Sequence, residues 1–143
     1  MTADITTGPD AHNGGADAIV GRGVRDGARM FREWFAELTE AASGRRDVAY
    51  TFVMGSVAEL LKSFDMPVVF PEINALQTAI RHDADSYLNE AEDYGFSPDI
   101  CGYVKADIAM QLRGGEHPMG TIPKPGMAVL TNACNTYIKW AEI

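Results

Sequence analysis

The feature that most constrains the fold of this chain is a repeated order, in which a short apolar run is followed directly by a helix start. Residues 49–54 form one run, and Ser56 with Glu59 has the spacing of a capping box for a short helix. Residues 67–70 form a second, and Pro71 suits the first turn of a helix. Residues 127–131 form a third. Strands that alternate with helices predict an α/β fold with a mainly parallel sheet.

Helical periodicity fills most of the remaining chain. It predicts helices over 24–43, 71–80 and 83–94, the last ending at Gly95. Ser97 is the predicted N-cap of a further helix, with Pro98 at its first position. Residues 1–23 are rich in Gly, Asp, Thr and Ala and predict a disordered tail. The predicted organisation is therefore a tail over 1–23, an N-terminal helical addition over 24–48 and an α/β lobe over 49–143.

Composition excludes several classes of protein. The 143 residues are 46% apolar, enough for one domain with a core, and carry a formal net charge of −8. That charge argues against non-specific nucleic-acid binding, which needs a basic surface. No apolar run reaches the roughly 18 residues of a membrane span, and residues 1–17 lack the apolar part of a signal peptide. We therefore expect a cytoplasmic protein with no membrane or nucleic-acid partner.

Cys101 and Cys134 are the two cysteines of the chain, and each is predicted at a helix start. Free N–H groups and the positive end of the helix dipole favour the thiolate there, and the thiolate is the form that binds metal. The pair indicates part of a metal-cluster site, although two cysteines are too few to complete one. The alternative is that each cysteine is a small buried apolar residue.

Glu72 is the third candidate site residue. It follows the predicted strand 67–70, as Cys134 follows the strand 127–131. Ligands of open α/β sheets bind outside the carboxyl ends of the strands, so we expect Glu72, Cys134 and Cys101 to face one crevice. The alternative for Glu72 is a carboxylate that only complements the dipole of its helix.

Three segments resemble the family of 2-hydroxyacyl-CoA dehydratase and ATP-dependent benzoyl-CoA reductase subunits. They are residues 70–75, residues 91–107 with their Asp-Ile-Cys-Gly-Tyr core, and residues 132–140. Their order and spacing fit, and the resemblance covers residues from about 50 to the end. Residues 104–107, Val-Lys-Ala-Asp, and the upstream residues 50–53 resemble the benzoyl-CoA reductase branch more than the dehydratases.

The resemblance implies a Rossmann-like α/β lobe that is half of a two-lobed subunit, so we expect the chain to be an N-terminal portion. Family subunits pair with a paralogous second subunit, and each subunit can hold a 4Fe-4S cluster through three cysteines. Cys101 and Cys134 match the first two of these ligands. The third ligand would lie outside this chain. We expect the two sulfurs within roughly 10 Å of each other if they share a cluster.

The resemblance also implies the chemistry. An electron of very low potential is added to the thioester of an aromatic acyl-CoA, which becomes a ketyl radical. A separate iron–sulfur activator protein couples ATP hydrolysis to the delivery of that electron. Glu72 is the candidate catalytic acid or base. Three alternatives stay open: a dehydratase that eliminates water from a 2-hydroxyacyl-CoA, a non-catalytic paired subunit, and an α/β interaction domain without metal.

Overall fold

The computed structural model describes residues 14–52, 55 and 57–140, with side chains from residue 21 to residue 137 within these ranges. The chain divides into two compact units, Met1–Glu33 and Trp34–Ile143. In chain order, the elements are α1 (Gly14–Gly44), β1 (Ala49–Thr51), α2 (Ala58–Ser63), β2 (Val68–Val69), α3 (Pro71–Ile80), α4 (Ala84–Tyr94), α5 (Gly102–Leu112), β3 (Glu116–His117), β4 (Gly120–Thr121), β5 (Met127–Val129) and α6 (Asn135–Trp140).

The first unit holds the N-terminal part of α1. That helix begins at Gly14, so the predicted helix start at Val24 is wrong, and residues 14–23 are helical instead of part of a tail. Arg29 stabilises this stretch through ion pairs with Asp26 and Glu33, at spacings that place side chains on one helix face. Residues 1–13 of the predicted tail lie outside the described residues. Among the described residues, no helix is long and apolar enough to cross a membrane.

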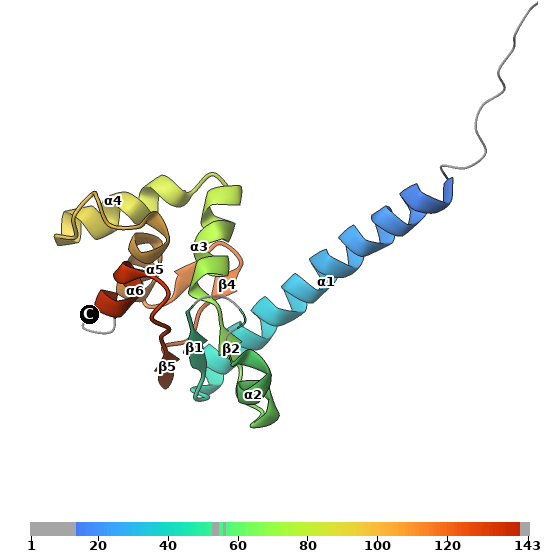
Figure 1. Ribbon diagram of the computed structural model, residues 1–143, viewed down its shortest axis with the longest axis horizontal. Helices are drawn as coiled ribbons and strands as arrows, with labels where there is room; N and C mark the ends of the chain where they lie inside the picture. The colour runs from blue at the N-terminus through green and yellow to red at the C-terminus, as the bar shows by residue number, and fades with distance from the viewer. Residues whose placement is uncertain (1–13, 53–54, 56, 141–143) are drawn as a thin grey trace, which may run out of the picture. The chain divides into compact units, whose positions relative to one another are not determined.

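A three-stranded parallel sheet lies at the centre of the second unit. Its strand order is β2-β1-β5, so β1 pairs with both neighbours (Figure 1). Ala49 is in register with Val68 on one side and with Met127 on the other. All residues of β1 and β2 are buried, which is typical of parallel strands covered on both faces. The predicted α/β fold with a parallel sheet is confirmed.

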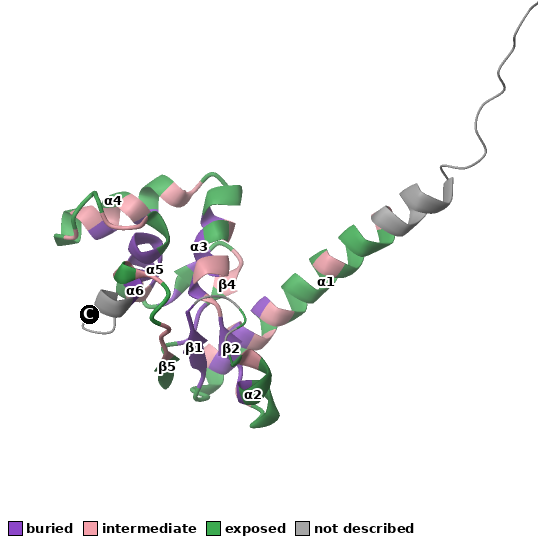
Figure 2. Ribbon diagram, in the orientation of Figure 1, coloured by how far each residue is buried: buried purple, intermediate pink, exposed green. Residues whose placement is uncertain are grey.

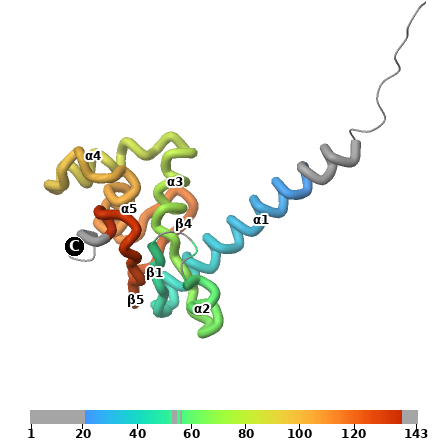
Figure 3. The backbone as a smooth tube through the Cα atoms, viewed as in Figure 1, coloured from blue at the N-terminus to red at the C-terminus, as the bar shows by residue number. Residues whose placement is uncertain are grey.

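The helices of the second unit connect these strands. α2 leads from β1 to β2, and α3, α4 and α5 lie between β2 and β5 in the chain. Both α3 and α4 pack against α5, and α3 lies beside α5 in both the ribbon and the tube view (Figures 1 and 3). The chain goes from β1 to β2 on one side of β1 and later returns to β5 on the other side. The carboxyl end of β1 is therefore a topological switch point of the sheet.

The core of the second unit lies around β1 and against α5, where buried residues concentrate in Figure 2. Two polar groups inside it are hydrogen-bonded to the backbone of distant segments. The Tyr50 hydroxyl donates to the carbonyl of Pro123 at 2.7 Å, and the Trp34 indole N–H donates to the carbonyl of Val68 at 2.9 Å. Buried polar groups cost free energy unless they are hydrogen-bonded, so these contacts fix how the helices sit on the sheet.

A short β-hairpin lies in the Pro- and Gly-rich segment between α5 and β5. β3 and β4 pair in antiparallel register, with His117 opposite Gly120. Gly120 has φ 148°, and a Cβ atom there would overlap the hydroxyl of Thr39. The same hydroxyl accepts a hydrogen bond from the N–H of Thr121 at 3.1 Å. Contact with α1, and not local strand propensity, therefore stabilises this short hairpin.

Two predicted helix starts are shifted. α2 has Val57 as its N-cap, with φ 54°, and Ser56 of the predicted capping box lies outside the described residues. α5 begins at Gly102 and not at Ser97. The Ser97 side chain accepts from the N–H of Asp99 at 3.2 Å, so it closes a turn, and the extended ψ of 128° at Cys101 separates that turn from the helix.

Lys105 ties this turn to two helices. Its ammonium group donates to the Glu92 carboxylate on α4 at 2.5 Å and to the carbonyl of Pro98 at 2.9 Å. The Lys105 side chain is only 7% exposed, so solvent screens the pair weakly. The contact holds the segment before Cys101 against α4 and α5.

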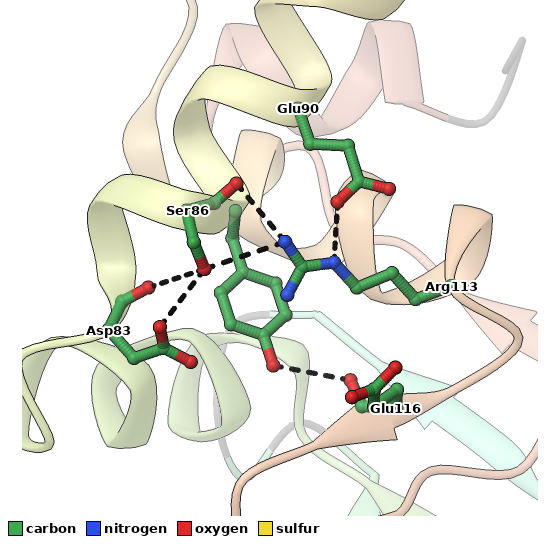
Figure 4. A network of polar contacts seen from close by, with 6 residues as sticks. Asp83, Ser86, Glu90, Arg113 and Glu116 are labelled. Carbon is green, nitrogen blue, oxygen red and sulfur yellow. Dashed lines mark hydrogen bonds and ion pairs between the residues drawn. The ribbon is translucent and has the colours of Figure 1, made fainter.

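A second polar cluster joins α4 to the end of α5. The guanidinium of Arg113 lies 3.9 Å from the ring centroid of Tyr87 and donates to the Glu90 carboxylate and the Ser86 carbonyl. Figure 4 shows Arg113 between Glu90 and Ser86, with Glu116 of β3 nearby. This cluster is structural, since it fixes the packing of α4 on α5.

We predict that Lys105→Met lowers the free energy of unfolding by about 2–3 kcal/mol, because it leaves the Glu92 carboxylate and the Pro98 carbonyl without their shared donor. Chemical denaturation measures this loss. The matched control is Lys62→Met, since Lys62 pairs with Glu37 at an exposed position and should cost less than about 1 kcal/mol. Equal losses in the two variants would contradict the structural role of Lys105.

His117 generates a pH-dependent prediction. Its ring stacks on Phe35, its Nδ1 accepts from the N–H of Met119 at 3.1 Å, and its Nε2 lies 3.1 Å from the carbonyl of Asn74. These partners require the neutral ring with its proton on Nε2. Burial lowers the His117 pKa, which the Asn74 carbonyl partly offsets.

Because the folded-state pKa lies below the ordinary value of 6.5, the unfolded state binds more protons at acidic pH. Neutral His117 therefore makes its full contribution to the free energy of unfolding above pH 6.5. Below that pH the contribution falls, by at most about 1.4 kcal/mol for each pH unit. Urea midpoints of wild type and His117→Phe between about pH 7 and about pH 5 should converge as pH falls. A constant difference would contradict this assignment.

Candidate active site at the carboxyl edge of the sheet

The candidate site lies at the carboxyl edge of the parallel sheet. β2 runs through Phe70 directly into α3, and β5 runs through residues 130–134 into α6. Because parallel strands end at the same edge, the starts of α3 and α6 are brought to one side of the sheet. Glu72 and Cys134 belong to these two starts, as the sequence predicts.

Glu72 sits in the first turn of α3. Phe70 has extended backbone angles at the N-cap, and Pro71 occupies the first turn, where its missing N–H is not needed. The Glu72 side chain is half-buried and forms a hydrogen bond with the hydroxyl of Tyr137 on α6, which donates to the carboxylate. The first turn of α3 is thus linked directly to α6.

Cys134 immediately precedes α6, and the predicted helix start there is confirmed. Its side chain is half-buried against the core. The backbone N–H groups of Thr136 and Tyr137 lower the pKa of the Cys134 thiol, and the Thr136 hydroxyl adds to the effect, while the Glu72 carboxylate opposes it. The start of α6 therefore stabilises the thiolate, the form that binds metal.

Cys101 is the N-cap of α5 and is also half-buried. Its backbone carbonyl accepts from the N–H of Lys105 at 3.1 Å, and its side chain packs against the same core cluster as Cys134. The turn that Lys105 anchors determines where α5 begins, so it also places the Cys101 thiol. That both sulfurs bind one cluster stays a prediction.

Tyr137 on α6 is hydrogen-bonded to Glu72 and is linked electrostatically to both cysteines. Its hydroxyl is buried, and burial is the largest cause of its raised pKa. The Glu72 carboxylate and the charges of Cys101 and Cys134 raise that pKa further. All three sequence candidates thus act electrostatically on one hydroxyl. In the sequence, Tyr137 is only one of the apolar residues of a predicted helix. Its position three residues after Cys134 is the one feature that could have placed it at the site.

Asp107 is a second residue that sequence reasoning missed. It is 1% exposed on α5, and burial raises its pKa from 3.8 to about 7, with a smaller rise from the Glu72 carboxylate and an opposing effect of Gln111. The Thr131 hydroxyl, which follows β5, is buried without a hydrogen-bond partner among the described residues. Buried polar groups without a hydrogen-bond partner are rare in folded proteins.

Among the described residues, two of the cavities that border the second unit have well-defined walls. One, of about 420 Å³, lies between α3, α4 and α5 and has Cys101 in its wall beside apolar residues such as Ala75, Leu88 and Ala106. The other, of about 480 Å³, includes Asp47 and Gly126 and lies at the amino ends of β1 and β5. Only the first of these two adjoins a sequence-predicted site residue.

The metal-binding capacity of the described residues is limited. No group of three or more His, Cys, Asp or Glu side chains among them is arranged to hold a metal ion. The two thiols have the donor chemistry of iron–sulfur ligands, and N–H donors of the kind that tune such ligands surround Cys134. Their chemistry fits part of a cluster site, and further ligands must complete it.

Comparison with known proteins identifies relatives. The family model described as 2-hydroxyglutaryl-CoA dehydratase, D-component, matches residues 54–143. A benzoyl-CoA reductase subunit of Thauera aromatica is 40% identical over 111 residues, which are 76% of this chain and 26% of the relative. The (R)-phenyllactyl-CoA dehydratase alpha subunit of Clostridium sporogenes is 34% identical over 59% of this chain and 21% of its own length.

The (R)-2-hydroxyisocaproyl-CoA dehydratase alpha subunit of Clostridioides difficile is 30% identical, again over 59% of this chain and 21% of the relative. The chain thus spans about a quarter of the length of the curated relatives it matches. It is more similar to the benzoyl-CoA reductase subunit than to these two dehydratase subunits, as its Val-Lys-Ala-Asp segment predicts. The chain belongs to the 2-hydroxyglutaryl-CoA dehydratase D-component family, which confirms the resemblance read from its sequence.

Proposed function

We propose that this chain contributes Cys101 and Cys134 to a 4Fe-4S cluster in an ATP-dependent enzyme that reduces an aromatic acyl-CoA. The observation that supports the proposal is that the Tyr137 hydroxyl is hydrogen-bonded to Glu72, while the charges of both thiols act on it electrostatically. The relative named as a benzoyl-CoA reductase subunit supports the substrate class. The third cysteine ligand would come from outside these 143 residues, which contain two cysteines.

The electrostatics of the site fit this role. Thiolates are the usual ligands of iron–sulfur clusters, and the start of α6 favours the thiolate of Cys134. When bound, such a cluster supplies electrons at the low potential that ketyl-radical chemistry on an aromatic thioester requires. The protein surroundings control solvent access to such a site, and both cysteines are half-buried, with Cys101 in the wall of an apolar cavity.

Glu72 is the proposed acid or base of the reaction. Its carboxylate lies in the first turn of the helix that follows β2, and the Tyr137 hydroxyl holds it by a hydrogen bond. A proton donor must lie within hydrogen-bond reach of the group it protonates, so this role requires that the substrate binds beside Glu72 at the carboxyl edge of the sheet. Tyr137 itself holds its proton firmly, since its pKa is raised.

The proposed partners are a paralogous second subunit and a separate activator protein that couples ATP hydrolysis to electron delivery. Relatives named alpha subunit support an assembly of unlike subunits. The second candidate function is elimination of water from a 2-hydroxyacyl-CoA, which the names of the dehydratase relatives favour. Anaerobic turnover of the assembled enzyme with activator, ATP and each class of acyl-CoA distinguishes the two. A non-catalytic paired subunit would bind no iron of its own in that assembly.

We predict that Cys101→Ser and Cys134→Ser each remove most of the iron that this subunit holds in the assembled enzyme, because a hydroxyl is a poor substitute for a thiolate ligand. Iron analysis and far-ultraviolet circular dichroism of the anaerobically purified enzyme measure ligation and fold separately. The neighbouring variant Ala133→Ser is the control and should keep its iron. Full iron retention in both cysteine variants would exclude these residues as ligands.

We predict that Glu72→Gln lowers turnover by about 10²–10⁴-fold while the iron content stays within a factor of about two of wild type, because the amide keeps the shape of the carboxylate but cannot transfer a proton. The control is Glu59→Gln, which changes the first-turn glutamate of α2 at an exposed position. If turnover and iron fell together in Glu72→Gln, Glu72 would have a structural role only.

A further inference from the structure

We propose that the cavity at the amino edge of the parallel sheet binds the phosphate groups of a small organic phosphate, with Arg45 and Lys124 as the principal cationic contacts. This cavity lies before β1 and β5, whereas the candidate active site lies where β2 and β5 lead into α3 and α6. The two sites are therefore at opposite edges of the sheet. The inference goes beyond the proposed function and does not depend on it.

Positive charge gathers in the wall of this cavity, although the chain as a whole is acidic. Arg45, Arg46 and Lys124 line it, and they are three of the 12 Lys and Arg residues in a chain of net charge −8. Among the described residues that line it, Asp47 alone is acidic. A concave surface with an excess of one sign of charge attracts ions of the other sign. The cavity therefore favours an anionic ligand.

The three cations differ in how far they are already engaged. The Arg46 guanidinium donates to the Asp65 carbonyl at 2.9 Å and pairs with the Asp65 carboxylate at 3.6 Å. No ion pair among the described residues includes Arg45 or Lys124. These two side chains come from different segments, the end of α1 and the loop before β5. A phosphate group has enough acceptor oxygens to pair with both of them.

The backbone of Arg45 is a second observation that favours a ligand. α1 ends at Gly44, Arg45 has φ 53°, and the N–H of Arg46 donates to the carbonyl of Ala41 at 3.0 Å. In this left-handed helix ending glycine is the usual residue, because a Cβ atom makes the conformation unfavourable. Strained residues of this kind cluster at functional sites. The Arg45 charge also complements the dipole of α1, but this does not explain Lys124, which lies outside that helix.

The backbone around Lys124 is held in place before any ligand binds. Pro123 and Pro125 flank it, and their rings fix their own φ angles. The carbonyl of Pro123 accepts from the Tyr50 hydroxyl at 2.7 Å, so the loop is tied to β1. A segment that is already ordered loses little conformational entropy on binding.

The rest of the wall indicates an organic ligand and not a bare anion. Ala41, Ile122 and Pro123 contribute apolar surface beside the cations. The volume of about 480 Å³ is much larger than one phosphate group needs. It lies in the range of small-molecule sites, roughly 300–1,000 Å³. A nucleoside diphosphate combines the required charge with an organic part, so ADP is a suitable probe.

Calorimetric titration of the purified full chain with ADP tests the inference. We expect saturable binding of ADP, weaker binding of pyrophosphate, which lacks the organic part, and no binding of adenosine, which lacks the phosphates. An absence of ADP binding, or adenosine binding as tight as that of ADP, would overturn the inference. Equal affinity for pyrophosphate and ADP would overturn the role of the apolar wall.

Single variants test the named contacts. Arg45→Met and Lys124→Met remove the charge and keep an apolar stem, and each should weaken ADP binding about fivefold or more. Asp47→Asn removes the opposing carboxylate and should strengthen binding, a gain that a misfolded variant cannot produce. Arg81→Met, which removes a cation outside the cavity wall, is the control and should change the affinity less than about twofold. Equal weakening in all three cation variants would mean non-specific attraction and would overturn the site.

Arg45→Gly separates binding from folding. Glycine suits the left-handed backbone at this position, so the urea midpoint should stay the same or rise while ADP binding weakens. A lower midpoint with unchanged ADP affinity would show that Arg45 serves only the helix end, and this would overturn its role as a ligand contact.

Coenzyme A carries the same diphosphate on a larger molecule, so a competition titration identifies the source of the phosphate. Displacement of ADP by coenzyme A would assign the cavity to the nucleotide part of an acyl-CoA. Retention of ADP in excess coenzyme A would assign it to a free nucleotide. Either result supports the phosphate site, and failure of the proposed acyl-CoA reaction would leave these binding measurements unaffected.

Discussion

The parallel pairing of β1 with both β2 and β5 is the interaction on which the rest of this structure depends. It aligns Ala49 with Val68 and with Met127, so the two outer strands run in the same direction and end at the same edge. The segments that leave those ends carry Glu72 and Cys134. A register shift of one residue in either pair would turn buried side chains outward and move these segments, so the site is as strongly specified as the core.

α5 is the second determinant of the site. Its buried run from Val104 to Met110 packs against α3 and α4, and its N-cap is Cys101. Lys105 fixes the turn before the helix, and Asp107 lies within electrostatic reach of Glu72. One helix therefore combines a predicted metal ligand, its anchor and a buried carboxyl group. A substitution that alters the packing of α5 is therefore expected to move the Cys101 thiol as well.

Local signals in the sequence predicted much of this arrangement. Pro71 and Gly95 mark a helix start and a helix end where the structure has them, and the apolar run 67–70 contains β2. The alternation of runs and helices predicted the parallel sheet, and hence that Glu72 and Cys134 would share an edge. These features depend on backbone preferences and on periodicity, which neighbouring residues determine.

The features that the sequence did not reveal depend on contacts between distant segments. The hairpin of β3 and β4 needs Thr39 of α1, and α5 starts late because Lys105 bonds to Glu92 and Pro98. Tyr137 and Asp107 look like ordinary helix residues in the sequence, but the fold hydrogen-bonds Tyr137 to Glu72 and buries Asp107. Burial and charge at these two positions are properties of the folded chain, so no local pattern could signal them.

The central claim is that the carboxyl edge of this sheet is where the protein holds iron. Anomalous diffraction at the iron absorption edge, from crystals of the iron-loaded enzyme grown without oxygen, tests it most directly. We expect a cluster of iron atoms in which one iron is bonded to the Cys101 sulfur and another to the Cys134 sulfur, on the side of the sheet where Tyr137 is hydrogen-bonded to Glu72. Iron at full occupancy elsewhere in the enzyme, with both sulfurs unbound, would contradict it.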